Sequence, residues 1–205
     1  IGFSPFLILA SDSVIIIALN AVLQYYGGES QGDTLITAAT IVQSYMLLIT
    51  SPMLGITGGS QPLISFNYGA NKPDRIRKTV KWVLVLCITF TTVMFLVSRI
   101  LPQYFVQIFT DNARYRELSI WGIQVFTLMV IPLSLQYVFV DALTALGMTR
   151  LSLSLSLFRK IVYFVSAFYA EPLADGAAAC LTSLVFFVIY RKYLKGEGRL
   201  GEIWL

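Results

Sequence analysis

The sequence contains no histidine and only two cysteines among its 205 residues. Both cysteines, Cys87 and Cys180, lie within apolar runs, where a thiol usually behaves as a small buried hydrophobic group. These scarcities exclude a disulfide framework, a zinc site and a nucleophile of the Cys–His type. No catalytic constellation is visible among the remaining residues, so we expect that the protein is not an enzyme and that it has no cofactor.

Charged residues are scarce as well. They make up 13% of the chain, whereas 57% of the residues are hydrophobic, and a soluble domain has about a quarter charged residues. A chain this apolar would expose large adhesive patches in water, so a lipid bilayer is the better solvent. The formal net charge of +4 does not indicate nucleic-acid binding, because the basic residues lie between apolar segments and not along one face.

Long apolar runs predict an all-α fold, a polytopic helical bundle integral to the membrane. The expected spans are residues 2–26, 34–68, 79–100, 117–147, 150–170 and 173–190, followed by a polar tail at 191–205. The second span exceeds the roughly 20 residues that a bilayer requires, so it must tilt, kink or protrude. Pro52, Pro62 and Pro132 are candidate hinges, because proline weakens helical hydrogen bonding. Residues 27–33 are predicted to form the first turn.

Basic residues assign the two sides of the membrane. With alternating spans, residues 71–81, residues 147–150 and the tail share one side and carry ten lysines and arginines. The opposite side carries three, Arg99, Arg114 and Arg116. The positive-inside rule makes the first side cytoplasmic, and we expect a multi-pass protein of the inner (cytoplasmic) cell membrane. The chain starts at Ile1 inside an apolar span, which suggests the interior of a longer protein.

Four stretches resemble, in this order, a known family: LNAVLQYYGG, SPMLGITGGSQPLISFNYGANKPDRIRK, ALTALGMTRLSLSLSLFRK and FYAEPLADGAAA. The resemblance is to bacterial members of the multidrug and toxin extrusion (MATE) family. It covers nearly the whole chain and corresponds to the C-terminal half of those proteins, helices seven to twelve. The second stretch is fairly specific, and its motif residues are Gln61, Pro62, Asn67, Tyr68, Gly69 and Arg75.

The resemblance implies one six-helix lobe of a two-lobe antiporter. Such a protein exports lipophilic, mostly cationic drugs and toxins in exchange for H⁺ or Na⁺. The implied partners are membrane lipids, small lipophilic cations and an N-terminal six-helix lobe of the same protein, absent here. Two alternatives stay open. One is a truncated, non-transporting membrane protein or interaction partner. The other is a lipid-linked sugar flippase of the same superfamily, for which more buried basic residues than Arg159 and Lys160 would be expected.

The chain departs from the family within its fifth predicted span, the eleventh helix of the family, because family members usually have more residues between positions 158–160 and 169–172. If Arg159 stays near the inner surface, only residues 161–170 remain to cross the membrane. They would form about 15 Å of helix against a hydrocarbon core of about 30 Å. Either residues are missing around Val165 and Ser166, or the helix is buried with Arg159 paired inside. We favour the first interpretation.

Polar residues inside the spans are the candidate coupling and substrate sites, since a charge at the bilayer centre costs at least about 2.5–3.5 kcal/mol. Asp12 lies close to the midplane of the first span, and Asn20 continues a polar strip outward. Asp12 either exchanges the coupling ion with the substrate or only hydrogen-bonds neighbouring helices. Asp141 either lines a cavity or pairs with a basic group such as Arg159 or Lys160. Gln136 is a candidate uncharged ligand near the midplane.

Overall fold

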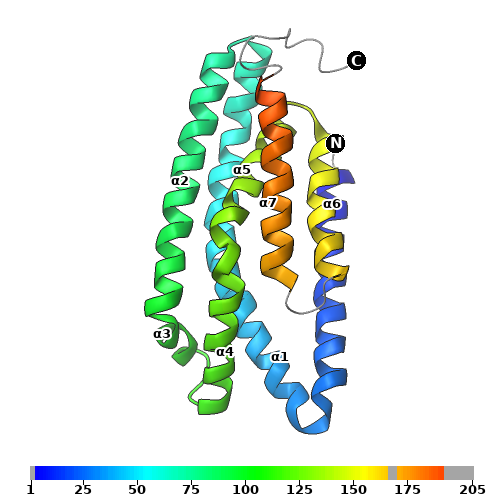
Figure 1. Ribbon diagram of the computed structural model, residues 1–205, viewed down its shortest axis with the longest axis vertical. Helices are drawn as coiled ribbons and strands as arrows, with labels where there is room; N and C mark the ends of the chain where they lie inside the picture. The colour runs from blue at the N-terminus through cyan, green and yellow to red at the C-terminus, as the bar shows by residue number, and fades with distance from the viewer. Residues whose placement is uncertain (1–2, 166–169, 192–205) are drawn as a thin grey trace.

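The computed structural model describes residues 3–165 and 170–191. Within these residues every regular element is helical. The elements are α1 (Phe3–Gly69), α2 (Pro73–Ile100), α3 (Pro102–Gln107), α4 (Ala113–Phe126), the 3-10 turn η1 (Thr127–Met129), α5 (Val130–Ala145), α6 (Thr149–Val165) and α7 (Ala170–Ile189). The long helices run up and down beside one another in an elongated bundle (Figure 1). This arrangement confirms the predicted all-α class.

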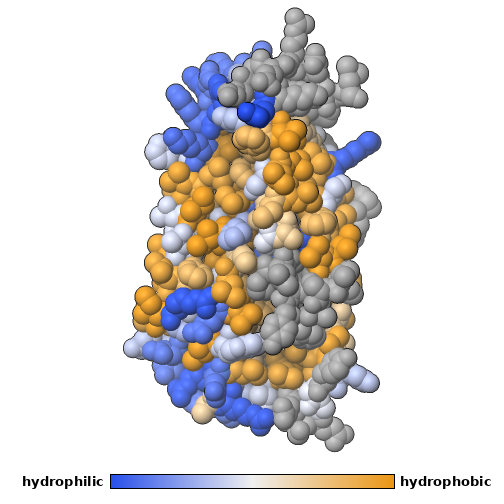
Figure 2. Space-filling model, viewed as in Figure 1, coloured by the Kyte–Doolittle hydropathy of each residue, from blue (hydrophilic) through white to orange (hydrophobic). Residues whose placement is uncertain are grey.

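The surface has the two-ended polarity of a membrane protein. Three segments in the described part of the chain are long and apolar enough to cross a bilayer: Gly32–Gly69, Pro73–Ile100 and Ala113–Ala145. Ser13–Tyr25 and Asp175–Ile189 are shorter apolar helices. Hydrophobic residues dominate the middle of the molecule, and hydrophilic residues gather towards its two ends (Figure 2). The protein is therefore a multi-pass membrane protein.

α1 consists of two helical limbs that meet at Gly28, where the backbone leaves the helix at φ 59° and ψ −169°. This conformation is essentially restricted to glycine. A Cβ atom on Gly27 would lie 2.6 Å from the Cα atom of Gly32, so the chain folds back tightly. The two limbs diverge from this bend at one end of the molecule (Figure 1). The predicted turn at residues 27–33 thus contains the reversal, but most of it is helical.

The three candidate hinge prolines differ in their surroundings. α1 continues through Pro52 and Pro62, since its non-helical backbone lies at Gly28. Pro132, by contrast, follows a break, because residues 117–147 are divided among α4, η1 and α5. The proline ring has no N–H and crowds the carbonyl group four residues earlier, at Leu128. The interruption at Thr127–Met129 therefore has a local cause.

The bundle has its own packed interior, to which the second limb of α1 and the helices α2, α4, α5, α6 and α7 contribute. Tyr45 is 2% exposed. Its hydroxyl group donates a hydrogen bond of 3.4 Å to the Met94 carbonyl oxygen on α2. Its ring meets Phe105 edge to face at 5.0 Å between centroids. The hydroxyl groups of Ser98 and Thr127, 3.0 Å apart, connect α2 to η1. These contacts hold the long helices in register.

The motif that carries the family resemblance forms the connection between α1 and α2. Asn67 is buried and donates from its amide nitrogen to the Leu63 carbonyl oxygen at 2.8 Å. Its main-chain carbonyl oxygen accepts from the Lys72 backbone nitrogen at 2.9 Å, and Asn71 adopts a positive φ of 53°. This connection lies at the same end of the bundle as the connection between α5 and α6 and the end of α7 (Figure 1). We call this the basic end.

Candidate functional site

A cavity of about 420 Å³ lies between the two limbs of α1 and the helices α4, α5, α6 and α7. We call it the central cavity. The first limb of α1 supplies an apolar wall, and the second limb adds hydroxyl and amide groups. The remaining helices supply aromatic and charged side chains. The lining residues are Ile15, Ile16, Leu19, Thr40, Gln43, Ser44, Met46, Leu47, Thr50, Phe126, Leu133, Tyr137, Arg159, Lys160 and Asp175.

An ion pair between α6 and α7 forms part of the cavity wall. The Nη1 atom of Arg159 donates to the Oδ1 atom of Asp175 at 3.2 Å. The Asp175 side chain is 3% exposed and that of Arg159 is 19% exposed. The guanidinium carbon of Arg159 also lies 5.6 Å from the centre of the Tyr137 ring on α5. Three helices therefore meet at this pair.

The two carboxylate oxygens of Asp175 differ in their hydrogen bonding. Asp175 Oδ2 is buried and has no hydrogen-bond partner within residues 3–165 and 170–191. Lys160 also lines the cavity, and its charge acts on the same carboxyl group. With two cations and one anion, the described lining carries a formal charge of +1. The cavity therefore combines fixed charge of both signs with apolar and aromatic walls, as ligand sites do.

The predicted site residues do not all lie in this cavity. Asp12 belongs to the first limb of α1, but its side chain lies outside the described residues. Asn20 is half-buried on the same limb. Gln136 is 4% exposed on α5, and its Oε1 atom has no hydrogen-bond partner among the described residues. Neither Asn20 nor Gln136 lines the central cavity.

Asp141 occupies a separate position nearer the basic end. The side chains of Thr57 and Gln61, both on the second limb of α1, lie close to its carboxyl group. Gln61 belongs to the sequence motif discussed above. Asp141 therefore joins α5 to α1, and the structure does not place it in the central cavity.

The structure corrects the position that we expected for Arg159. We favoured a position near the inner surface, with residues missing around Val165 and Ser166 of the same helix; residues 166–169 lie outside the described residues. Arg159 instead lies inside the bundle with an acidic partner, which is the alternative that we set aside. That partner, Asp175, was missed because it stands at the start of a span that otherwise contains no charge. The consecutive basic residues Arg159 and Lys160 were the available indication that an acid was needed nearby.

Comparisons with known proteins identify what this architecture is similar to. The family model MatE matches residues 9–169. Among solved structures, that of the MATE multidrug transporter DinF-BH matches with a TM-score of 0.78 and 24% sequence identity. The match covers 93% of this chain and 45% of that chain, so this chain spans less than half the length of that transporter. At this identity the likeness demonstrates the fold. No curated protein matched the chain.

Proposed function

The chain belongs to the MatE family, and from that premise we propose that it is the C-terminal six-helix lobe of an antiporter. The antiporter exports lipophilic, mostly cationic compounds in exchange for H⁺ or Na⁺ and performs no enzymatic reaction. Its place is the inner (cytoplasmic) membrane, with the basic end in the cytoplasm. The observation that carries the proposal is the central cavity of about 420 Å³, which has a buried acid–base pair in its wall.

Coupling to an ion gradient has a physical reason. Moving a monovalent cation outward against 100 mV, inside negative, costs about 2.3 kcal/mol before any concentration gradient is considered. An entering H⁺ or Na⁺ offsets this cost if it competes with the substrate for one acid. Asp12 is our candidate, because it precedes Ile15, Ile16 and Leu19 by three, four and seven positions. That spacing belongs to one face of a helix, and the other three residues line the cavity.

The charge of the lining gives this exchange a direction. Arg159, Lys160 and Asp175 together contribute +1. An ionised Asp12 on the same face makes the sum zero and allows a cation to be held against the aromatic walls. When Asp12 takes up a proton or Na⁺, the sum returns to +1 and repels the cationic substrate. Asp175 does not serve this purpose in our proposal, because Arg159 already holds it.

The remaining candidates have supporting roles in this proposal. Asn20 and Gln136 are uncharged ligands that become accessible when the lobe changes conformation, and Asp141 fixes α5 to α1. The break before Pro132 is a hinge. Rocking of this lobe against an N-terminal lobe gives alternating access to a site near the bilayer midplane. A single lobe cannot enclose such a site, so residues 1–205 alone are expected not to transport.

The test is drug resistance in an efflux-deficient bacterium that carries the full-length gene. Asp12→Asn is expected to remove resistance to lipophilic cations, since the amide side chain cannot exchange its charge. Asp33→Asn is the matched control, because Asp33 is exposed and lies outside the cavity. Resistance that survives in the Asp12→Asn strain, at equal expression, contradicts the coupling role. A parent gene that confers no resistance favours the non-transporting alternative.

A flippase for lipid-linked sugars is the second candidate, and one observation favours it. Arg159 and Lys160 both line the cavity, where basic groups suit an anionic head group. Lys160→Gln separates the two functions. It lowers the cavity charge by one unit, so export of cations should persist or improve, whereas movement of an anionic lipid should decline. Loss of cation export in this variant, with anionic lipid movement intact, contradicts both assignments.

A further inference from the structure

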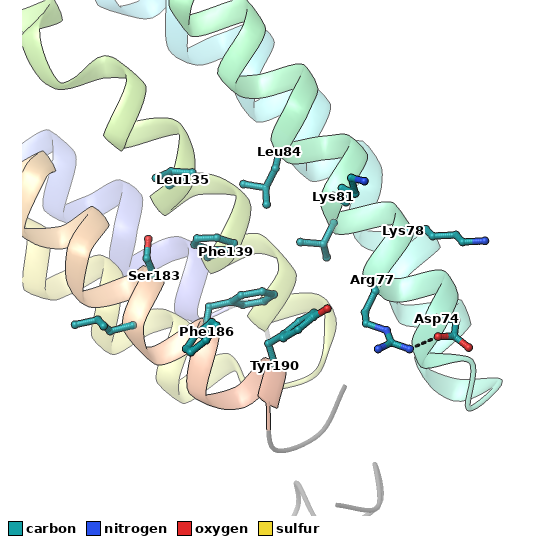
Figure 3. A pocket seen from close by; sticks show the side chains of 13 residues that line it. Asp74, Arg77, Lys78, Lys81, Leu84, Leu135, Phe139, Ser183, Phe186 and Tyr190 are labelled. Carbon is teal, nitrogen blue, oxygen red and sulfur yellow. Dashed lines mark hydrogen bonds and ion pairs between the residues drawn. The ribbon is translucent and has the colours of Figure 1, made fainter. Parts of the chain in front are cut away.

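A second hollow, separate from the central cavity, opens on the side of the bundle near the basic end. It lies between α2, α5 and α7 and has a volume of about 1100 Å³. We call it the lateral groove. Figure 3 shows Leu84, Phe139 and Phe186 from these three helices around the hollow, and the Lys78 side chain extends outward from its α2 rim. Its volume slightly exceeds the range of roughly 300–1,000 Å³ for small-ligand pockets.

The groove has a charged head and an apolar body. Arg77, Lys78 and Lys81 on α2 form the head together with one acid, Asp74. The body is lined by Leu84 on α2, by two residues of α5 and by the α7 side chains that face them. The apolar and aromatic residues of the body are Leu84, Leu135, Phe139, Leu184, Phe186 and Phe187. The rings of Phe139 and Phe186 stack at 4.4 Å and form a smooth wall.

The basic groups of the head are not equivalent. Arg77 forms an ion pair with Asp74, so its charge is matched. Lys78 and Lys81 are exposed and have no acidic partner among the described residues. The head of the groove therefore presents two uncompensated positive charges.

The dimensions of the groove fit within one leaflet of a bilayer. Its α2 wall, which includes the charged head, runs from Asp74 to Leu84, and ten residues of helix extend about 15 Å. One leaflet together with its head-group region is about 20 Å thick. The flanking surface is also suited to lipid, because Trp82, Leu86 and Val188 expose more than half of their side chains on the same helices.

We propose that the lateral groove binds an anionic phospholipid of the surrounding membrane. The phosphate lies between Lys78 and Lys81, and an acyl chain lies along Phe139 and Phe186. Basic pockets between transmembrane helices attract anionic head groups for this reason. The same charge disfavours a lipophilic cation in the groove. The proposal does not depend on the transport function, because it uses neither the central cavity nor Asp12.

The test measures lipid binding to the purified full-length protein by native mass spectrometry and by exchange in nanodiscs. The probes are phosphatidylglycerol and phosphatidylcholine. We expect preferential retention of phosphatidylglycerol and a loss of about tenfold or more in its affinity in Lys78→Gln/Lys81→Gln. The control is Lys72→Gln/Arg75→Gln, which removes the same charge at the same exposed end but outside the groove. It should retain the lipid.

A second variant examines the apolar body without changing charge. Ser183 lines the groove, and Ser183→Phe should fill the body and lower phosphatidylglycerol affinity while the lysines stay in place. Three results would overturn the proposal. They are equal binding of phosphatidylcholine, an equal loss in the control pair, and unchanged affinity in either groove variant. Displacement by inorganic phosphate alone would also overturn it, because that result describes an anion site without a lipid chain. Unchanged thermal unfolding confirms that each variant is folded.

Discussion

At the scale of single residues, the pair of Arg159 and Asp175 determines how α6 and α7 are held together. A charge inside a membrane protein is tolerated when it is paired or faces water. Arg159 satisfies both conditions, since it bonds Asp175 at 3.2 Å and lines the central cavity. The Tyr137 ring supports the same guanidinium group from α5. The pair therefore fixes the inner wall of the cavity.

Removing the charge of one member of this pair should lower the stability of the protein more than removing both charges. Arg159→Met or Asp175→Asn alone leaves one charge in the bundle without its counter-charge, and we expect a loss of about 3–5 kcal/mol in the free energy of unfolding. The double variant Arg159→Met/Asp175→Asn leaves no unmatched charge and should recover much of this loss. Thermal or denaturant unfolding in detergent measures the three values. Additive losses would show that the two side chains do not stabilise each other.

The candidate site could be predicted from the sequence only in part. Apolar runs reveal which acids lie inside the membrane, so Asp12 and Asp141 were visible as candidates. The partner of each charge depends on how the helices fold back on one another. Asp175 stands 16 residues after Arg159 and meets it because α6 and α7 pack together. No local sequence pattern indicates such a pairing, so Asp175 was not predicted from the sequence as the partner of Arg159.

At the scale of elements, close approach between α4 and the second limb of α1 depends on one glycine. A Cβ atom added to Gly122 would lie 2.6 Å from the Cγ2 atom of Val42. Both residues are buried, so the side chain of Val42 has little room to move. The absence of a side chain at position 122 allows these two helices to touch.

Gly122→Ala should therefore destabilise the protein by about 1–3 kcal/mol, the usual cost of an overpacked contact. Val42→Ala in the same chain removes the clashing methyl group and should restore most of the lost stability. Gly55→Ala is the matched control, since a Cβ atom there meets nothing within 4 Å. The midpoint of thermal unfolding in detergent compares the variants. A Gly122→Ala protein as stable as the Gly55→Ala protein contradicts the predicted contact.

The positions of membrane spans depend on apolar length, whereas the ends of helices depend on local backbone chemistry. Hydropathy predicted a span at residues 79–100, whereas α2 begins at Pro73. The helix starts earlier because proline suits a first turn and Asp74 complements the helix dipole. The break at Thr127–Met129 also interrupts an apolar run without a change in composition. Apolar length thus located the spans, and local backbone chemistry determined where helices start and break.

At the scale of the whole molecule, the distribution of charge follows the path of the chain. The connection after α1, the connection after α5 and the end of α7 lie together (Figure 1). The connection between α3 and α4 lies at the opposite end (Figure 1), where Asp111 is exposed. Since the first end carries Lys72, Arg75 and Lys78, the positive-inside rule predicts that this end lies in the cytoplasm. This arrangement makes the orientation of the entire bundle a single testable property.

Cysteine labelling from outside intact cells tests that orientation. Cys87 is buried and Cys180 is exposed on α7, so both are first replaced by alanine in the full-length protein. In that background Asp111→Cys should react with a membrane-impermeant maleimide, and Asn71→Cys should react only after the membrane is permeabilised. Both positions are exposed, so a difference in labelling reports the side of the membrane and not burial. The reverse pattern would place the basic end outside. It would also place the head of the lateral groove in the outer leaflet, because both assignments depend on the same lysines and arginines.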